Sequence, residues 1–441
     1  MVLPESGSSW FYDPKKNEAS AAAGQVCVDS FSNSPFIQVD LLKAGDFNFR
    51  DPRGFRYTDK LPFVAGVKAK LEAALGWYPG LFEEVTGGLW LPKWYTETIV
   101  TDGVGTKVEL ANALYTLISQ IEWKHGRHIA WFREMAKNLI AMSADDIARY
   151  GWLPLLYSNV IDYSKLDDSN AVAYRELMLG LGDILKKLWI VLMTGESAKL
   201  SQFVGSENPK ALFPFNWSGA MQWLYHEKLN ITGEEVREWD YIVLLWQGGV
   251  RSNGITKIRE YLALMYGKEW WNNPAALADI EEALTPSVVY SGLIAEVNGW
   301  HSNGERKMFM TGIGHISWGG LEEKVLPMFA NKWLSANIDN PFPIPGINGR
   351  ALHTFREAEK PMTIEEAFGT WPMGQGMAVT FRTQAEAEAF IALAKNKHDI
   401  EARIGGRVIK TPKWQKPHLQ VTARYNEKEI GEKITLPPLA A

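Results

Sequence analysis

The chain has 441 residues, a formal net charge of −5 and 46% hydrophobic residues. This ordinary globular composition excludes a wholly disordered chain, and the length predicts two or three domains. The charge gives no reason to expect nucleic acid as a partner, because long-range attraction to a polyanion needs a basic field.

Cysteine usage and hydropathy predict where the protein resides. Cys27 is the one cysteine, so the fold does not depend on an internal disulfide. The first ten residues lack the basic-then-apolar layout of a secretory signal. The most apolar run, 188–193, is far shorter than the roughly 20 residues of a membrane helix. We therefore expect a cytoplasmic protein without a membrane partner.

Apolar periodicity predicts helices and strands that alternate along most of the chain. The expected helices are 63–75, 108–121, 129–150, a helix capped by Asp168 that runs to about 187, 255–266 and 384–395. The expected strands are 155–160, 188–193, 241–246, 377–381 and 407–410. This order is typical of mixed α/β sheets with helices packed on a face.

Polarity also predicts the domain boundaries. The stretch 227–240 is polar with few apolar anchors, so we place a boundary there and predict domains at 1–228 and 229–410. Residues 411–441 contain Pro and Lys, and we expect an extension with little core of its own.

The segment 101–107, TDGVGTK, packs an acid, two glycines, a hydroxyl and a lysine in front of a predicted helix. Glycines let backbone N–H groups approach phosphates, and a helix start favours anions. Lys107 would neutralise phosphate charge and Asp102 would hold Mg²⁺. The spacing is not that of a Walker A loop, and a plain tight turn explains it equally well on spacing alone.

Four further stretches carry candidate chemistry. Asp146 follows another acid inside a predicted helix, where a solvated face is the alternative. Glu196 follows a buried strand, where open α/β proteins gather ligand groups, although a helix-capping loop would look the same. The glycine-bearing loops 248–254 and 315–320 are the others, and each also fits a plain turn. His125 and His128 are better explained as surface histidines than as a metal pair.

Taken in order, these stretches resemble the phosphoribosylformylglycinamidine cyclo-ligase (AIR synthetase) family from about residue 28 to 410. TDGVGTK matches the family signature letter for letter. LIAMSADDI, TGESAKLSQ, QGGVRSNG, HISWGG and GTWPMGQGMAVTF are weaker matches that gain weight from their order. The chain departs from the pattern at five places: Arg251 replaces a histidine, Lys199 an acid, Thr194 a glycine, Asp145 an asparagine and Asn138 an aspartate.

The resemblance implies a two-domain α/β subunit with mixed sheets, helices packed on them and a homodimer through a β-barrel-like core. It also implies ATP- and Mg²⁺-dependent closure of formylglycinamidine ribonucleotide to aminoimidazole ribonucleotide in purine biosynthesis, with release of ADP and phosphate.

Site residues follow from the same resemblance. The implied catalytic residues are Asp102, Lys107, Arg251 and His315. ATP would contact Gly103, Gly105, Thr106, Lys107, Asp146 and Glu196. Mg²⁺ would bind Asp102, Asp146 and Glu196, and the substrate would contact Ser252, Asn253, Gly254, Gly319 and Gly320.

Two other functions compete with this one. The chain could be another ATP-using member of the superfamily, such as a kinase or a selenophosphate-synthetase-like enzyme. Cys27 lacks the glycine-rich context that the latter needs. It could also be a nucleotide-binding relative that has lost cyclisation, which the changes at Arg251 and Lys199 make plausible.

Overall fold

A computed structural model gives the structure of the chain. It describes residues 83–85, 88–90, 95–121, 127–302, 304–329, 332–358 and 361–437. The helix predicted at 63–75 and His125 lie outside these residues. Contacts divide the chain into two compact units. The first comprises 1–143, 153–228 and 300–305; the second comprises 144–152, 229–299 and 306–441.

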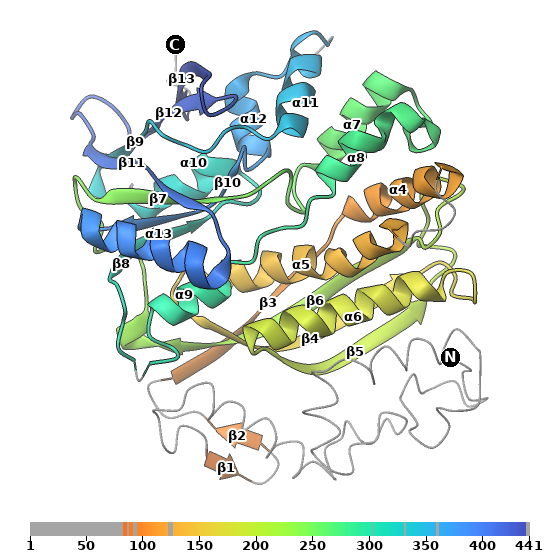
Figure 1. Cartoon of the computed structure of the whole chain (residues 1–441). Helices are drawn as coiled ribbons and strands as arrows, with labels where there is room; N and C mark the ends of the chain where they lie inside the picture. Colours follow the sequence, from red (N-terminus) through yellow and green to blue (C-terminus); the bar gives the residue numbers. More distant parts are fainter. Residues whose placement is uncertain are drawn as a thin grey trace. The chain divides into compact units, whose positions relative to one another are not determined.

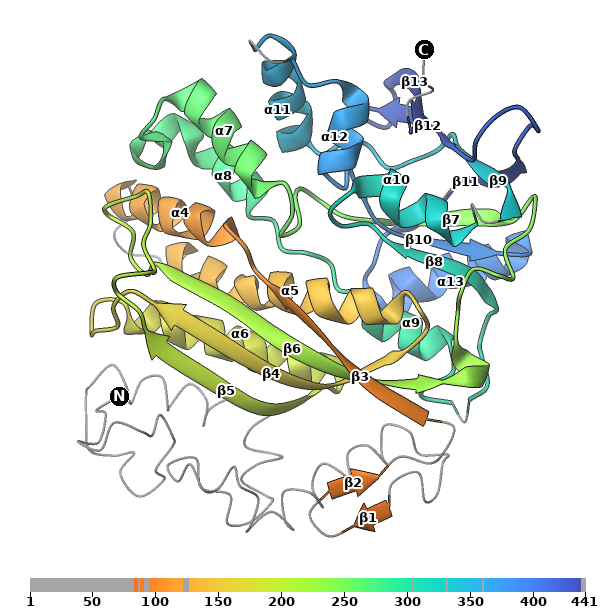
Figure 2. The ribbon, with the colours of Figure 1, turned by 180° about the vertical axis from the view of Figure 1, so that it is seen from behind.

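The first unit is built on a four-stranded sheet in the order β3-β6-β4-β5, with β4 and β5 parallel and the other neighbours antiparallel. The strands are β3 (Tyr95–Gly103), β4 (Leu153–Tyr163), β5 (Val191–Lys199) and β6 (Phe215–His226). Helices α4 (Lys107–Ile121), α5 (Arg127–Ala148) and α6 (Ala171–Leu188) cover one face of it (Figures 1 and 2). The last five residues of α5 count with the second unit.

Alternation along the strands explains which face the helices cover. On β4 the odd-numbered residues from Tyr157 to Tyr163 are buried, whereas Val160 is 41% exposed. Because successive side chains of a strand point to opposite faces, the buried set packs under the helices and Val160 faces away from them. Ile99 of β3, 61% exposed, shares the face of Val160.

The second unit is built on a seven-stranded sheet in the order β13-β12-β9-β11-β7-β10-β8. Its strands are β7 (Tyr241–Trp246), β8 (Met310–His315), β9 (Leu334–Ile338), β10 (Gln375–Phe381), β11 (Ala402–Lys410), β12 (Leu419–Arg424) and β13 (Ile430–Leu436). Its α-helices are α7 (Ile255–Tyr266), α8 (Leu277–Ala283), α9 (Ser291–Val297), α10 (Gly320–Val325), α11 (Gly346–Arg356), α12 (Ile364–Thr370) and α13 (Gln384–His398). Short β1 (Glu83–Val85) and β2 (Gly88–Trp90) pair with each other.

The mixed α/β class is confirmed, and several predicted elements match the structure. The strand 241–246 and the helix 255–266 are confirmed to the residue. The core of the second unit gathers Val243 and Leu245 of β7, Met377 and Val379 of β10 and Phe390 of α13. These side chains recur at the strand and helix spacings from which the elements were predicted.

Two local predictions were wrong. β5 continues through 194–199, which we expected to be a loop, because these residues pair in parallel register with 158–163 of β4. Asp168 does not cap α6; the helix begins after Asn170, whose Oδ1 accepts from the backbone N–H of Asp167 at 2.9 Å.

The carboxyl-terminal segment also differs from the prediction of little core. β12 and β13 extend the seven-stranded sheet, and Leu419, Val421 and Ala423 are fully buried. Parallel pairing with 336–338 of β9 gives these apolar side chains neighbours that are distant in the sequence.

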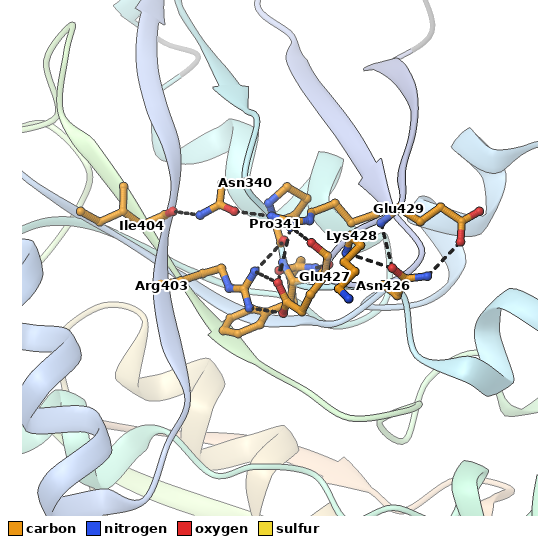
Figure 3. Close-up of polar contacts among 11 residues, drawn as sticks. Asn340, Pro341, Arg403, Ile404, Asn426, Glu427, Lys428 and Glu429 are labelled. Carbon is orange, nitrogen blue, oxygen red and sulfur yellow. Dashed lines mark hydrogen bonds and ion pairs between the residues drawn. The ribbon is translucent and has the colours of Figure 1, made fainter.

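Hydrogen bonds connect the turn between β12 and β13 to β11 (Figure 3). Arg403 of β11 donates to Glu427 Oε1 at 2.6 Å, and its guanidinium lies 4.2 Å from the Phe342 ring centroid. Asn426 Oδ1 closes the turn by accepting from the backbone N–H groups of Lys428 and Glu429. The turn is therefore held both by strand pairing and by a charged hydrogen bond.

Gly349 offers a stabilising substitution. It lies inside α11, and a Cβ built on it meets no atom within 4 Å. Because alanine has the higher helix propensity and lowers the entropy of the unfolded chain, we expect Gly349→Ala to raise the free energy of unfolding by about 0.5–1 kcal/mol. Urea titration measures this, and a lower midpoint would show that the site has no room for the methyl group.

Glu296 of α9 provides a pH-dependent prediction. Burial alone would raise its pKa, but hydrogen bonds from Lys307, Lys397 and His398 outweigh burial and lower the pKa from 4.5 to about 2. A depressed carboxyl pKa contributes stability that is complete above about pH 4.5 and is lost as the pH falls towards 2.

We expect Glu296→Gln to lower the free energy of unfolding at pH 7 by about 1–3 kcal/mol, a range that allows for the exposure of the two lysines. The difference from the wild type should narrow below pH 4.5. Denaturant unfolding at several pH values measures it, and a gap that is constant down to pH 3 would exclude the ionised carboxylate as its source.

Candidate functional site

A pocket of about 440 Å³ opens on the sheet of the first unit. This volume is in the range of small-molecule sites. Its lining comes from all four strands: Thr101, Asp102, Ser158, Asn159, Val160, Thr194, Glu196, Ser218, Gly219 and Ala220. The lining includes two carboxylic acids and four hydroxyls but no Lys or Arg, so the pocket suits a cation or the hydroxyl groups of a ligand.

The predicted phosphate segment 101–107 forms the passage from β3 to α4 beside this pocket. Asp102 lies next to the last residue of β3, and its Oδ1 accepts from the N–H of Gly103 at 2.7 Å. Gly105 has a φ of 58°, a left-handed conformation that glycine adopts without strain. α4 then begins at Lys107, so the segment is a strand-to-helix turn as predicted.

Lys107 does not extend into the pocket. Its side chain is fully buried, and Nζ donates to Asn138 Oδ1 of α5 at 2.9 Å. A buried ammonium needs such hydrogen-bond acceptors. The described structure therefore gives Lys107 a role in joining α4 to α5, whereas the sequence predicted contact with phosphate.

Asp102 and Glu196 border the pocket from opposite edges of the sheet. β3 and β5 are its edge strands, with β6 and β4 between them. Three inter-strand spacings separate the two residues, roughly 14 Å along the sheet. Their register also assigns them to opposite faces, because Asp102 pairs with Gly219 and Glu196 with Val160. One Mg²⁺, with ligand distances of about 2.1 Å, does not reach both carboxylates directly.

Two buried polar groups lie on the face of the sheet that carries Asp102. Asn159 is 3% exposed, and its Oδ1 accepts from Trp217 Nε1 at 3.0 Å. Among the described residues, Asn159 Nδ2 and the hydroxyl of Tyr157 have no hydrogen-bond partner. Burial, and then the charge of Asp102, raise the pKa of Tyr157, so its hydroxyl stays protonated. Such buried donors normally meet a ligand or water.

In the second unit, the predicted residues Asp146 and His315 contact each other. His315 is fully buried, and its Nδ1 lies 2.8 Å from Asp146 Oδ1. Burial and the charge of Arg251 lower the pKa of His315 despite its carboxylate partner. Burial would raise the pKa of Asp146, but the hydrogen bond to His315 and nearby cations lower it. The pair is thus poised with an ionised carboxylate beside a neutral imidazole.

Asp145 and Arg251, also in the second unit, form a buried ion pair. Arg251 Nη2 donates to Asp145 Oδ2 at 2.8 Å, and both side chains are 0% exposed. Arg251 was predicted as a catalytic group, but the structure places its guanidinium inside the fold.

The two predicted substrate loops are both strand-to-helix turns of the second unit. Ser252, Asn253 and Gly254 are partly exposed and precede α7. Gly319 precedes α10 and Gly320 is its first residue, with φ angles of 87° and 59°. A Cβ at Gly320 would lie 1.7 Å from the Phe368 carbonyl oxygen, so this turn depends on glycine.

Two features are absent from the described residues. No group of three or more His, Cys, Asp or Glu side chains gathers there to hold a metal ion. A magnesium ion at Asp102 would therefore take most of its ligands from water or a bound phosphate, as Mg²⁺ usually does. Within the same residues, no helix is long and apolar enough to cross a bilayer.

Sequence reasoning missed most of the pocket lining. Ser158, Thr194 and Ser218 lie on three different strands and come together only through the register of the sheet. The one local signal was a polar residue at alternate positions of otherwise apolar strands.

Fold and site together define a two-unit mixed α/β protein with an acidic, hydroxyl-lined pocket beside a glycine-bearing strand-to-helix turn. No family model matches the chain. Phosphoribosylformylglycinamidine cyclo-ligase from Pyrococcus furiosus is 26% identical over 309 residues, covering 70% of this chain and 78% of the relative. The enzyme of the same name from Streptococcus pyogenes is 27% identical over 312 residues, covering 70% and 80%. These relatives confirm the resemblance that the sequence motifs indicated, and the low identities show that this chain has diverged from them.

Solved structures show more distant likenesses. Thiamine-monophosphate kinase from Stenotrophomonas maltophilia gives a TM-score of 0.46 at 14% identity, covering 80% of this chain and 94% of that one. The hydrogenase maturation protein HypE from E. coli gives 0.47 at 15% identity, covering 85% and 97%.

Proposed function

We propose that the protein is an ATP-dependent cyclo-ligase that closes formylglycinamidine ribonucleotide to aminoimidazole ribonucleotide. The observation that carries this proposal is the intact TDGVGTK segment, which forms a strand-to-helix turn at the rim of the 440 Å³ pocket. Relatives that carry the cyclo-ligase name match 70% of the chain and support the same reaction.

The pocket fits a magnesium–nucleotide complex better than a bare triphosphate. With two acids and no basic residue in its lining, it would repel an uncompensated phosphate chain. Mg²⁺, when bound, would neutralise that charge. We assign Asp102 as the metal ligand, whereas Glu196 lies on the opposite face of the sheet and is not assigned to the metal. Asn159 Nδ2 is a donor for a phosphate or hydroxyl oxygen, and the N–H groups of Gly103 and Gly105 lie in the turn beside Asp102.

The proposed reaction proceeds in two steps. The formyl oxygen of the substrate attacks the terminal phosphorus of ATP, ADP leaves, and the oxygen becomes part of a good leaving group. The neighbouring nitrogen then attacks the former formyl carbon, and phosphate departs as the ring closes. Positioning and charge stabilisation supply most of the catalysis in such transfers. Asp146 and His315 remain our candidates for handling the proton of that nitrogen, since their carboxylate–imidazole pair is the titratable dyad of the predicted set.

One assay tests this function. Purified protein is mixed with formylglycinamidine ribonucleotide, ATP and Mg²⁺, and ADP and aminoimidazole ribonucleotide are quantified. We expect both products in equal amounts and only when all three components are present. ADP without the imidazole product would support another ATP-using reaction of the superfamily instead.

A nucleotide-binding relative without cyclase activity is the second candidate. Its support is Arg251, which stands where the family keeps a histidine and is fully buried on Asp145. Tight ATP binding in calorimetry, with no turnover in the assay above, would select this candidate.

The proposal includes a cytoplasmic homodimer that pairs through a β-barrel-like core, as the resemblance implies. Light scattering coupled to size exclusion should give twice the chain mass, and a monomer mass would refute the dimer.

A further inference from the structure

We infer that Asp145 and Arg251 act as one positioning unit that holds the loop 248–254 in shape, so that two departures from the family pattern compensate each other. The inference deepens the proposed function, because this loop is its candidate substrate loop. Asp145 stands where the family has asparagine and Arg251 where it has histidine. In the structure the two replacements meet as a single ion pair of 2.8 Å.

The carboxylate of Asp145 joins three parts of the second unit. Its Oδ2 accepts from Arg251, and its Oδ1 accepts from the backbone N–H groups of Tyr290 and Ser291 at 2.8 and 2.9 Å. It therefore connects the end of α5, the loop 248–254 and the start of α9. The guanidinium lies 5.5 Å from the Tyr290 ring centroid, so the aromatic ring also contacts the arginine.

Both charges are completely buried, so we expect either replacement alone to destabilise the fold. A buried charge that loses its partner is strongly destabilising, whereas a matched pair or a neutral pair is not. Asparagine with arginine would leave the cation without its carboxylate. Aspartate with histidine would leave the anion facing a mostly neutral ring. The two residues are thus energetically coupled.

The same pair fixes the shape of the loop. Arg251 is held inside the fold while the next three residues are partly exposed. The far end of the loop is held at Gly254, which has a φ of 71° and whose carbonyl accepts from Trp371 Nε1 at 3.1 Å. The near end is held at Gln247, whose N–H donates to the Gly374 carbonyl at 3.1 Å. A loop fixed at three points presents its backbone to a ligand without a further ordering cost.

Arg251 therefore holds the shape of the loop but does not transfer protons. A guanidinium does not exchange protons near neutral pH, and that of Arg251 is paired with Asp145 inside the fold. The loop of this chain therefore positions a ligand through the backbone and side chains of 252–254, and Arg251 is a positioning residue.

A double-mutant cycle tests the coupling without any assumption about activity. The variants are Arg251→His, Asp145→Asn and the double variant with both. We expect each single change to lower the thermal midpoint by roughly 6–20 °C and the double variant to recover most of that loss. Arg251→Lys, which keeps the charge but not the planar fork, replaces any single variant that fails to fold. If the double variant is no more stable than the less stable single variant, Asp145 and Arg251 are not coupled and the inference fails.

Hydrogen exchange and kinetics test the positioning. At 25 °C, the amides of Ser252 and Asn253 should exchange at least tenfold faster in Arg251→Lys than in the wild type, and at the wild-type rate in the double variant. Unchanged exchange would reduce the pair to a stabilising contact and overturn the positioning role. In the cyclisation assay, Arg251→Lys should raise the KM for formylglycinamidine ribonucleotide about tenfold and leave the KM for ATP unchanged. If the wild type converts no substrate, the proposed function fails while the exchange result still decides the positioning role.

Discussion

Replacing Asp102 by Asn should lower ATP turnover about 1000-fold or more while leaving the fold intact. Asp102 lies at the rim of the pocket, in the turn that leads into α4, and is our assigned magnesium ligand. An amide oxygen carries no net charge, so the variant loses most of the electrostatic attraction for the cation. A metal contributes several kcal/mol to charge stabilisation in a transition state, which corresponds to this loss in rate.

The measurement is ADP release at saturating ATP and increasing Mg²⁺. Asp168→Asn is the matched control, because Asp168 is an exposed acid of the same unit outside the pocket lining. We expect the control to keep wild-type rates. Circular dichroism should show equal helix content in both variants. Wild-type turnover by Asp102→Asn would remove the metal role from this residue and with it the proposed nucleotide site.

Gly180→Ala should be among the most destabilising single changes in the first unit. Gly180 lies on α6, and a Cβ built on it would come within 2.0 Å of the Arg133 carbonyl oxygen on α5. The contact is with backbone, so no side chain can rotate away and the two helices must separate. We expect a loss of about 3 kcal/mol or more in the free energy of unfolding, even though alanine favours the helix by about 1 kcal/mol.

Chemical denaturation compares this variant with Gly205→Ala. A Cβ at Gly205, in a loop of the same unit, meets nothing within 4 Å. The control should change the unfolding midpoint little. A midpoint for Gly180→Ala equal to that of the control would mean that α5 and α6 are not packed as closely as the structure shows.

Local sequence patterns predicted the bounds of single helices and strands better than they predicted which strands pair. The strand 241–246 and the helix 255–266 were predicted to the residue because each has its own periodicity and its own bounding residues. The strand β5 was cut short because Thr194 and Gly195 look like a turn, and only pairing with β4 makes them strand. The contribution of 419–436 to the core was underestimated for the same reason, because its partner strand β9 lies far away in the sequence.

The candidate site shows the same division. The motif at 101–107 identifies Asp102 and the start of α4 from neighbouring residues alone, because the chemistry of glycines, an acid and a helix start is contiguous in the chain. No local pattern could show that Glu196 lies at the opposite edge of the sheet or that Lys107 is buried on Asn138. Strand order and side-chain burial decide those points.

The amino-acid sequence by itself determined the mixed α/β class, the glycine-bearing turns and the likeness to the cyclo-ligases, since each depends on residues close together in the chain. Tertiary structure alone decided which charges meet. Asp145 and Asp146 are neighbours in sequence, yet one is buried on Arg251 and the other contacts His315. The physical reason is that adjacent positions on a helix point about 100° apart, so the surrounding fold selects a different partner for each carboxylate.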